Sequence, residues 1–392
     1  MMQTITIHTS EIDDPEAAVA ELLAQLETKG PLLAHSVGLV TCFADFISAG
    51  IVEDLAKKLP FEILGTTTIA GASESAAGEV LLFLTVLTGD DVEFVAGLTD
   101  PIGAEDIAPI SAAWEKAAAG RAEKPALMLS FAPLLTNVSG DFFADAFSAV
   151  SGNVPNFGTL AVDHNADYHE SMVIFNGAAY PDRYGFILCY GKIKPLFFVG
   201  GLSEKRAFRG KGVVTASAGN QLEGVNGISV ADYLSGLGLK KGPDGALKGI
   251  NAYPFILDYN DGTQPVIRVM FAITPEGHAV CGGNMPVGAS LQVGVIDAAE
   301  VLSVTEETIK SALAIGQNNG MESGAMLIFS CVGRYFAQGF HPEAEMQKAQ
   351  EILKGKASFH LSYSGTELCP VYGQNGSTRN RSHNDSIVIC MF

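Results

Sequence analysis

The chain has 392 residues, 47% of them hydrophobic, which is enough for the cores of about two or three globular domains. Its formal net charge of −19 argues against nucleic acid or an anionic membrane surface as a partner, because both would repel it. The six cysteines are scattered without a Cys-x-x-Cys pair, so we expect reduced thiols that pack as small apolar residues.

The N-terminus and the apolar runs predict a cytoplasmic protein that does not insert into a membrane. The first residues lack a basic segment followed by a long apolar core, so no secretory signal is expected. Apolar runs such as 80–87 and 185–190 have the length of strands, well short of the ~20 residues that span a bilayer.

The hydrophobic pattern predicts an α/β (α+β) fold in which one order of elements occurs twice. The chain opens with strand 37–42, helix 49–59 and strand 61–65, followed by a predicted hairpin of 80–87 with 92–96. The first copy then reads helix 104–119, strand 126–131, helix 140–150, and strands 155–162 and 171–175. The second follows a predicted hairpin of 278–281 with 290–294 and reads helix 298–314, strand 325–330, helix 342–353, and strands 358–363 and 386–391.

This repeated order predicts two similar halves of mixed, largely antiparallel sheets covered by helices. An αββα-type arrangement, with two such layers packed sheet to sheet, is the expected way to join them. The alternative is that the shared order is a coincidence, because residue identity between the copies is slight.

The strand 325–330 ends in Cys331-Val332-Gly333-Arg334, and ligands usually dock at strand exits in α/β layers. Arg334 offers a planar fork suited to a carboxylate, and a nearby guanidinium would favour a reactive thiolate at Cys331. The alternative is a buried cysteine beside an arginine that caps a carbonyl.

Two segments further along carry more polar groups. Glu367 lies in a turn-rich segment, and Asn380, His383 and Asn384 belong to a loop before the last strand. We interpret these loops as part of a site, against the alternative of a solvated hairpin whose Asn and Gly residues only satisfy turns.

The loop that holds Asp163 and His164 occupies, in the first copy, the place that Glu367 occupies in the second. Its Asp and His residues resemble metal-ligand spacing, but no second ligand cluster accompanies them. No metal is therefore expected, and the absence of a phosphate-binding loop or a dinucleotide pattern predicts no other cofactor.

These residues resemble the FIST family, whose members have an N-terminal and a C-terminal FIST domain. The C-terminal resemblance rests on residues 327–334, Glu367-Leu368-Cys369-Pro370 and the 380–384 loop, preceded by 273–278 and 286–291. The N-terminal resemblance rests on 64–68, 157–163 and 214–220. The resemblance as a whole implies an N-terminal flank at 1–30, a FIST N-like domain at 31–222 and a FIST C-like domain at 223–392.

The resemblance implies a sensory domain in signal transduction that binds amino acids or similar small metabolites, with no established reaction. Members are often fused to output modules, so this chain is expected to signal to a separate protein. One departure is Thr366, where the family usually has Gly, which reaches positive φ freely.

The leading hypothesis is a cytoplasmic sensor that binds a small polar, amino-acid-like metabolite between the halves. Arg334 would hold the ligand's carboxylate and Glu367 its ammonium group. The other site residues would be Cys331, Asn380, His383, Asn384, Asp163 and His164. The alternatives are a cysteine-dependent enzyme with Cys331 as nucleophile and His383 as base, and a protein-interaction scaffold.

Overall fold

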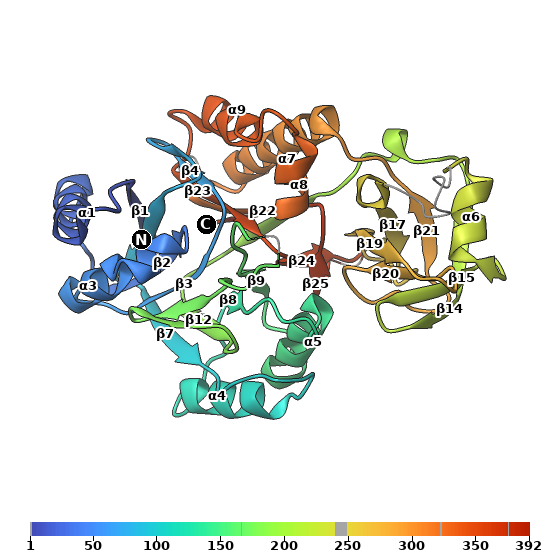
Figure 1. Cartoon of the computed structure of the whole chain (residues 1–392). Helices are drawn as coiled ribbons and strands as arrows, with labels where there is room; N and C mark the ends of the chain where they lie inside the picture. Colours follow the sequence, from blue (N-terminus) through green and yellow to red (C-terminus); the bar gives the residue numbers. More distant parts are fainter. Residues whose placement is uncertain (1, 166, 240–248, 322–323, 375) are drawn as a thin grey trace.

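Three six-stranded sheets surround a common core, and a fourth sheet lies beside them (Figure 1). The structure is a computed structural model, and it describes residues 2–165, 167–239, 249–321, 324–374 and 376–392. The predicted class, mixed α/β with largely antiparallel sheets, is confirmed. The repeat that the sequence analysis describes in two copies occurs here three times, in three units that run consecutively along the chain.

Each unit has the same order of elements. The first comprises β1 (Met2–Thr9), α1 (Pro15–Lys29), β2 (His35–Cys42), α2 (Asp45–Ser48), α3 (Ile51–Lys58), β3 (Ile63–Thr67), β4 (Gly71–Ser73), β5 (Ala77–Gly78) and β6 (Leu82–Gly89). The second comprises β7 (Val92–Leu98), α4 (Ala108–Ala118), β8 (Leu127–Ala132), α5 (Gly140–Ser151), β9 (Asn156–Leu160), β10 (Val173–Phe175), β11 (Ala178–Tyr180) and β12 (Gly185–Gly191). The third comprises β13 (Leu196–Gly200), α7 (Ala298–Asn318), β22 (Met326–Cys331), α8 (Val332–Ala337), α9 (Ala344–Leu353), β23 (Phe359–Ser364), β24 (Glu367–Tyr372), β25 (Thr378–His383) and β26 (Ile387–Met391).

The units exchange hairpins. The sheets have the orders β1-β6-β2-β3-β10-β11, β7-β12-β8-β9-β24-β25 and β13-β26-β22-β23-β4-β5. Each sheet is therefore built from four strands of one unit and the two-stranded hairpin of another. The central pairs β2/β3, β8/β9 and β22/β23 are parallel, as expected when a helix connects the two strands, and the remaining pairs are antiparallel.

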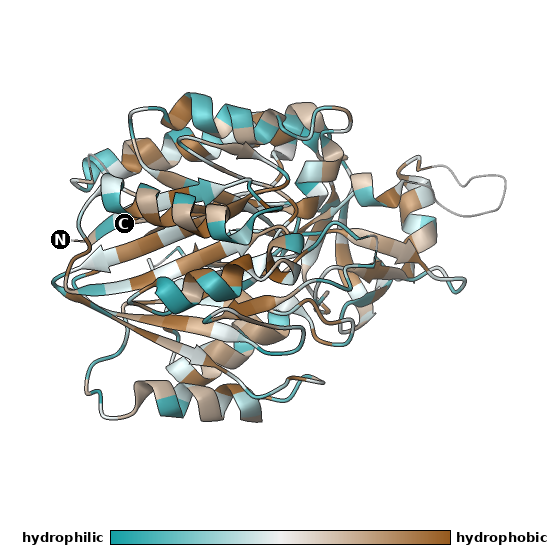
Figure 2. Ribbon diagram, turned by 60° about the vertical axis from the view of Figure 1, so that its left-hand side comes forward, coloured by the Kyte–Doolittle hydropathy of each residue, from teal (hydrophilic) through white to brown (hydrophobic). Residues whose placement is uncertain are grey.

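The inner faces of the three sheets share one core. It contains Leu39 and Leu64 from the first sheet, Leu129 from the second, and Phe329 and Val388 from the third. The outer face of each sheet packs on the helices of its own unit, which gives three further clusters. Figure 2 shows that the strands are largely hydrophobic, while the helices alternate hydrophilic and hydrophobic residues. The sequence predicted two layers packed sheet to sheet. The structure instead has three sheets around one shared core.

A subdomain is inserted in the third unit between β13 and α7, and Figure 1 shows it at one side of the molecule. It comprises η1 (Glu204–Arg206), β14 (Lys211–Ala218), β15 (Gln221–Val225), β16 (Ile228–Ser229), α6 (Val230–Gly236), η2 (Ile250–Ala252), β17 (Phe255–Asp258), β18 (Val266–Arg268), β19 (Met270–Ile273), β20 (Ala279–Cys281) and β21 (Ser290–Val293). We call residues 204–293 the inserted subdomain.

Two kinds of sequence expectation are wrong. The strands of the predicted hairpins do not pair with each other: β6 pairs with β1 and β2, β7 pairs with β12, and β20 and β21 lie next to β15 and β14, respectively. The segments around Glu367 and Asn380 are the strands β24 and β25, not loops, because they pair with each other and β24 pairs with β9 of the second unit. A partner some 200 residues away leaves no local sequence signal.

One predicted domain limit falls inside a strand, and the predicted N-terminal flank is part of the first unit. Residues 2–29, assigned to an N-terminal flank, form β1 and α1, and β1 pairs with β6 along its whole length. The limit at residue 222 lies within β15, whose neighbour β14 precedes it and whose neighbour β20 follows it in the chain.

Candidate functional site

The central strands of the three units end at one place. The Val162 N–H donates to the Thr67 carbonyl (3.3 Å), and the Gly365 N–H to the Leu160 carbonyl (3.0 Å). A third bond, from the Tyr363 N–H to the Ala70 carbonyl (3.3 Å), completes a ring between the units. The residues that the sequence analysis selected around 163, 331 and 367 therefore follow strands whose ends meet.

A cluster of buried ionisable groups lies at this junction. It consists of Cys331 at the end of β22, Arg334 in α8, Glu367 at the start of β24, and Asp385 in the turn before β26. Their exposed fractions are 4%, 0%, 0% and 2%. We call these four residues the buried carboxyl cluster.

The two carboxyl groups carry most of the unmet hydrogen-bonding capacity in this cluster. Neither oxygen of Glu367 has a nitrogen or oxygen partner among the described residues, and the same holds for Oδ2 of Asp385. Burial, and then the neighbouring Asp385, raise the pKa of Glu367 well above its ordinary value, and the Arg334 guanidinium opposes this. Burial also raises the pKa of Asp385, to about 7. Both carboxyls are thus held toward the neutral form.

Two of the three guanidinium nitrogens of Arg334 already bind other residues of the protein. Its Nε and Nη2 both donate to Oε1 of Glu345 in α9 (3.1 and 2.6 Å), and Nη2 also donates to Thr305 Oγ1 in α7 (2.7 Å). The planar fork predicted to bind a ligand carboxylate is therefore occupied by Glu345. Nη1 has no partner among the described residues, and this one nitrogen could still meet a ligand.

Cys331 lacks the surroundings of an activated thiol. Burial, and then the charges of Glu367 and Asp385, raise the pKa of its thiol well above the ordinary value. Cys331 is the N-cap of the short helix α8, and a backbone hydrogen bond from Gly333 favours its thiolate, but burial and the two carboxyl groups outweigh this effect.

His383 and Asn384 face the inserted subdomain. The His383 Nε2 lies 3.1 Å from the Cys369 carbonyl oxygen, and burial lowers the pKa of this imidazole to about 4. An added Cβ at Gly282 of the inserted subdomain would lie 2.4 Å from Oδ1 of Asn384, which shows how closely these segments pack.

Asn380 joins the second and third units and does not reach the cluster. Its Nδ2 donates to Ser148 Oγ (3.0 Å) and to the Val154 carbonyl (2.9 Å), and its Oδ1 accepts from the Asn156 N–H (2.9 Å). All the hydrogen-bonding groups of its side chain are therefore used in tying α5 and β9 to β25.

Asp163 organises its own loop, and His164 points away from the cluster. The Asp163 carboxylate accepts from the N–H groups of Asn165 and Glu170 (both 2.6 Å). His164 is exposed, and its ring stacks on Phe43 with centroids 4.4 Å apart. Among the described residues, no group of three or more His, Cys, Asp or Glu is arranged to hold a metal ion.

The sequence analysis missed Asp385 and Glu345. Asp385 has a φ of +46°, a conformation that Asp and Asn tolerate better than most residues, and an Asn-Asp pair before a strand is a turn signal that could have drawn attention to it. Glu345 lies in a helix and has no comparable signal. Thr366 is not among the residues with positive φ, so the replacement of Gly does not strain the backbone there.

The chain belongs to the FIST family. The FIST N domain matches residues 36–228 and the FIST C domain matches residues 230–370, which confirms the predicted resemblance. FIST domains are sensory, ligand-binding domains of signalling proteins. No curated protein matches the chain.

One solved structure with a similar outline is the cyanuric acid hydrolase from A. caulinodans. It has 10% sequence identity and a TM-score of 0.39, and the alignment covers 100% of this chain and 99% of that one. No helix in the described part of this chain has the length and apolar character needed to cross a bilayer.

Proposed function

We propose that this FIST protein is a cytoplasmic sensor of a small amino-acid-like metabolite, which it binds at the buried carboxyl cluster. The observation that supports this most directly is a set of polar atoms with no nitrogen or oxygen partner among the described residues: three carboxyl oxygens, from Glu367 and Asp385, beside Nη1 of Arg334. The Cys331 thiol is a hydrogen-bonding neighbour of Glu367. Buried polar atoms in native proteins nearly always have partners, so such a concentration marks a place where a ligand supplies them.

The balance of groups favours an ammonium ligand. Acceptor atoms outnumber the one free donor, and the positive charge of Arg334 is already compensated by Glu345. An ammonium group supplies three donors and a charge that would ionise the carboxyls. A single ligand carboxylate would then meet Nη1 of Arg334. Glu367 thus has the role that the sequence analysis gave it, and Arg334 has a smaller one.

The test is calorimetric titration of the purified protein with each of the twenty standard amino acids, for wild type and Glu367→Gln. The substitution keeps the shape of the side chain and removes its charge. Loss of a charge-assisted hydrogen bond worth ~1.5 to 3 kcal/mol should weaken binding about tenfold to a hundredfold. Glu53→Gln, at an exposed position in α3, is the control and should leave the affinity unchanged.

Proton release gives a second readout. At pH 7 about half of the Asp385 carboxyls are protonated, and the raised pKa of Glu367 adds a further protonated group. Ammonium binding should therefore release more than about half a proton, seen as a dependence of the heat on the buffer. If no amino acid binds the wild type, the function is wrong. If Glu367→Gln binds as tightly as the wild type, the function can stand but the site is misplaced.

A further inference from the structure

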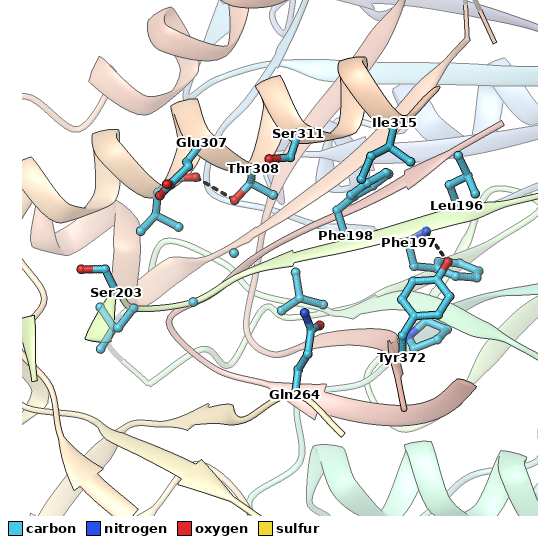
Figure 3. Close-up of a pocket in the computed structure, with 16 residues that line it drawn as sticks. Leu196, Phe197, Phe198, Ser203, Gln264, Glu307, Thr308, Ser311, Ile315 and Tyr372 are labelled. Atoms are coloured by element: carbon cyan, nitrogen blue, oxygen red, sulfur yellow. Dashed lines mark hydrogen bonds between the residues drawn. The ribbon is translucent and has the colours of Figure 1, made fainter. Parts of the chain in front are cut away.

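A groove of about 620 Å³ lies between β13 and α7, outside the buried carboxyl cluster (Figure 3). Its base includes Leu196 and Phe198 of β13, one wall carries Ser311 and Ile315 of α7, and Tyr372 of β24 stands at one end. We call this the edge groove, because β13 is the edge strand of its sheet.

The outer side of β13 carries backbone groups that can pair. β13 pairs with β26 on one side, and on the other the Phe197 N–H donates to the Tyr372 hydroxyl (3.3 Å). Because backbone groups alternate along a strand, the N–H and C=O of Val199 point to the same outer side. Among the described residues, no hydrogen bond satisfies them there.

The corresponding edge in the first unit is closed by its own helix. Gln25 of α1 accepts from the His8 N–H of β1 (3.2 Å) and donates to the His8 carbonyl (2.7 Å). Lys29 of α1 donates to the Thr6 carbonyl (2.6 Å). These side chains occupy outer backbone groups of His8 and Thr6 on the edge strand, which opposes the addition of another strand.

The second unit protects its edge with charge. Glu93 on β7 forms an ion pair with Arg121, and charged side chains on an edge strand disfavour pairing with another chain. Among the described residues, the third unit has neither device: β13 reads Leu-Phe-Phe-Val-Gly without a charge. Apart from Glu307 at the wall, α7 presents short or apolar side chains to the groove. Protection at the first two edges and its absence at the third indicate that the third is used.

We propose that the edge groove binds an extended segment of a separate protein, which adds to β13 as a further strand. The outer N–H and C=O of Val199 are the groups with which the backbone of an added strand would pair. Glu307 at the wall favours a basic residue in an otherwise apolar segment, and the net charge of −19 disfavours a second copy of this chain.

The edge groove is connected to the buried carboxyl cluster through one strand. β26 begins two residues after Asp385 and lies between β13 and β22 in the sheet. The role as the sensor's output surface rests on the proposed function, whereas peptide binding does not. Titrations with amino acids and with peptides are separate measurements, so the failure of one is distinguishable from the failure of the other.

The test uses fluorescent, capped peptides of alternating Val, Ile and Thr with one Lys placed at each position in turn, followed by fluorescence anisotropy with the full chain. We expect at least one peptide to bind, and its backbone N-methylated form to bind at least tenfold more weakly. Val199→Pro removes the outer N–H, and Ser311→Trp fills the groove; each should reduce binding at least tenfold. Val199→Ala and Gln317→Trp, the latter at an exposed position of α7 outside the groove, are the matched controls.

Three results would overturn the proposal. One is that none of the peptides binds the wild type. Another is that Val199→Pro and Ser311→Trp, each shown to be folded by circular dichroism, bind like their controls. The third is a dimer of the wild type in sedimentation experiments that Ser311→Trp abolishes, because the occupant would then be a second copy.

Discussion

At the residue scale, the buried carboxyl cluster combines ordinary residues in an unusually buried environment. Arg334 is compensated by Glu345, which leaves Glu367 and Asp385 without a cation of their own. Removing one partner of a buried pair such as Arg334–Glu345 typically costs about 3–5 kcal/mol. An Arg334→Ala variant would therefore report on folding more than on ligand binding, and Glu367→Gln is the better probe.

The raised pKa of Asp385 makes the stability of the protein depend on pH. Its value of about 7 in the folded state lies above the ordinary 3.8, so the folded state binds this proton more tightly than the unfolded state. The stability that this proton contributes is complete below pH ~4 and is lost as the pH rises to about 7, on the order of 4 kcal/mol in all. Glu367 shifts in the same direction and adds to the effect.

We predict that Asp385→Asn lacks this loss. The difference in unfolding free energy between wild type and variant should shift in the variant's favour as the pH rises from 5 to 8, measured by urea denaturation. Asp54→Asn, at an exposed carboxylate of α3 that pairs with Lys57 and lies outside the cluster, is the control. Parallel pH profiles for wild type and Asp385→Asn would contradict the prediction.

At the element scale, the three strands that pair with an exchanged hairpin use different side chains at that contact. Gly65 of β3 lies opposite Ile174, and Gly158 of β9 lies opposite Leu368, whereas Leu361 of β23 lies opposite Ala72. In each case a small residue faces a larger one: the exchanged hairpin supplies the larger residue in the first two sheets and the small residue, Ala72, in the third. An added Cβ at Gly158 would lie 2.2 Å from the Ser130 carbonyl oxygen, where the contact is with backbone.

We predict that Gly158→Ala destabilises the protein by about 2 kcal/mol or more, because the neighbouring backbone of β8 must shift. Gly236→Ala, in α6, is the control: an added Cβ there meets nothing within 4 Å, and alanine is the better helix former. The midpoint of thermal unfolding should fall for the first variant and hold or rise for the second. Equal midpoints would show that β8 and β9 can separate at little cost.

At the scale of the whole molecule, one buried ion pair joins the inserted subdomain to the second and third units. Arg268 of the inserted subdomain binds Asp141 of the second unit (2.8 Å) and the Ser382 carbonyl of the third (3.0 Å). Arg268 is fully buried, and the Asp141 carboxylate also accepts from the Ser382 hydroxyl (2.6 Å). The inserted subdomain is therefore fixed to the three six-stranded sheets near the C-terminal end of β25.

We predict that Arg268→Met costs about 3–5 kcal/mol, because it leaves the Asp141 charge buried without its partner. Hydrogen exchange should speed up in β18 and β25 before it does in β2 or β8. The double variant Arg268→Met/Asp141→Asn should recover part of the loss, and Arg379→Ala, at a surface pair with Asp261, should cost less than about 1 kcal/mol. A double variant no more stable than the single one would show that the pair is not what holds the subdomain.

The sequence by itself determined the FIST family and most of the secondary structure, because both depend on local patterns. Apolar runs such as 326–331 and the amphipathic stretch of α7 predict their own conformation from neighbouring residues. Strand partners do not follow from local pattern. The hairpin exchange, with Glu367 opposite Thr159, depends on packing between residues about 200 positions apart.

The tertiary structure alone decided what the candidate residues do. In the folded chain Cys331, Arg334 and Glu367 lie together, as the sequence suggested, and Asp385 joins them from a turn. The guanidinium of Arg334 binds Glu345. The side chains of Asn380 and Asp163 form hydrogen bonds with the backbone of neighbouring segments, which is a structural role. The physical reason is that a pKa and a free hydrogen-bonding atom are properties of surroundings, and these surroundings come from three units that meet only in the folded chain.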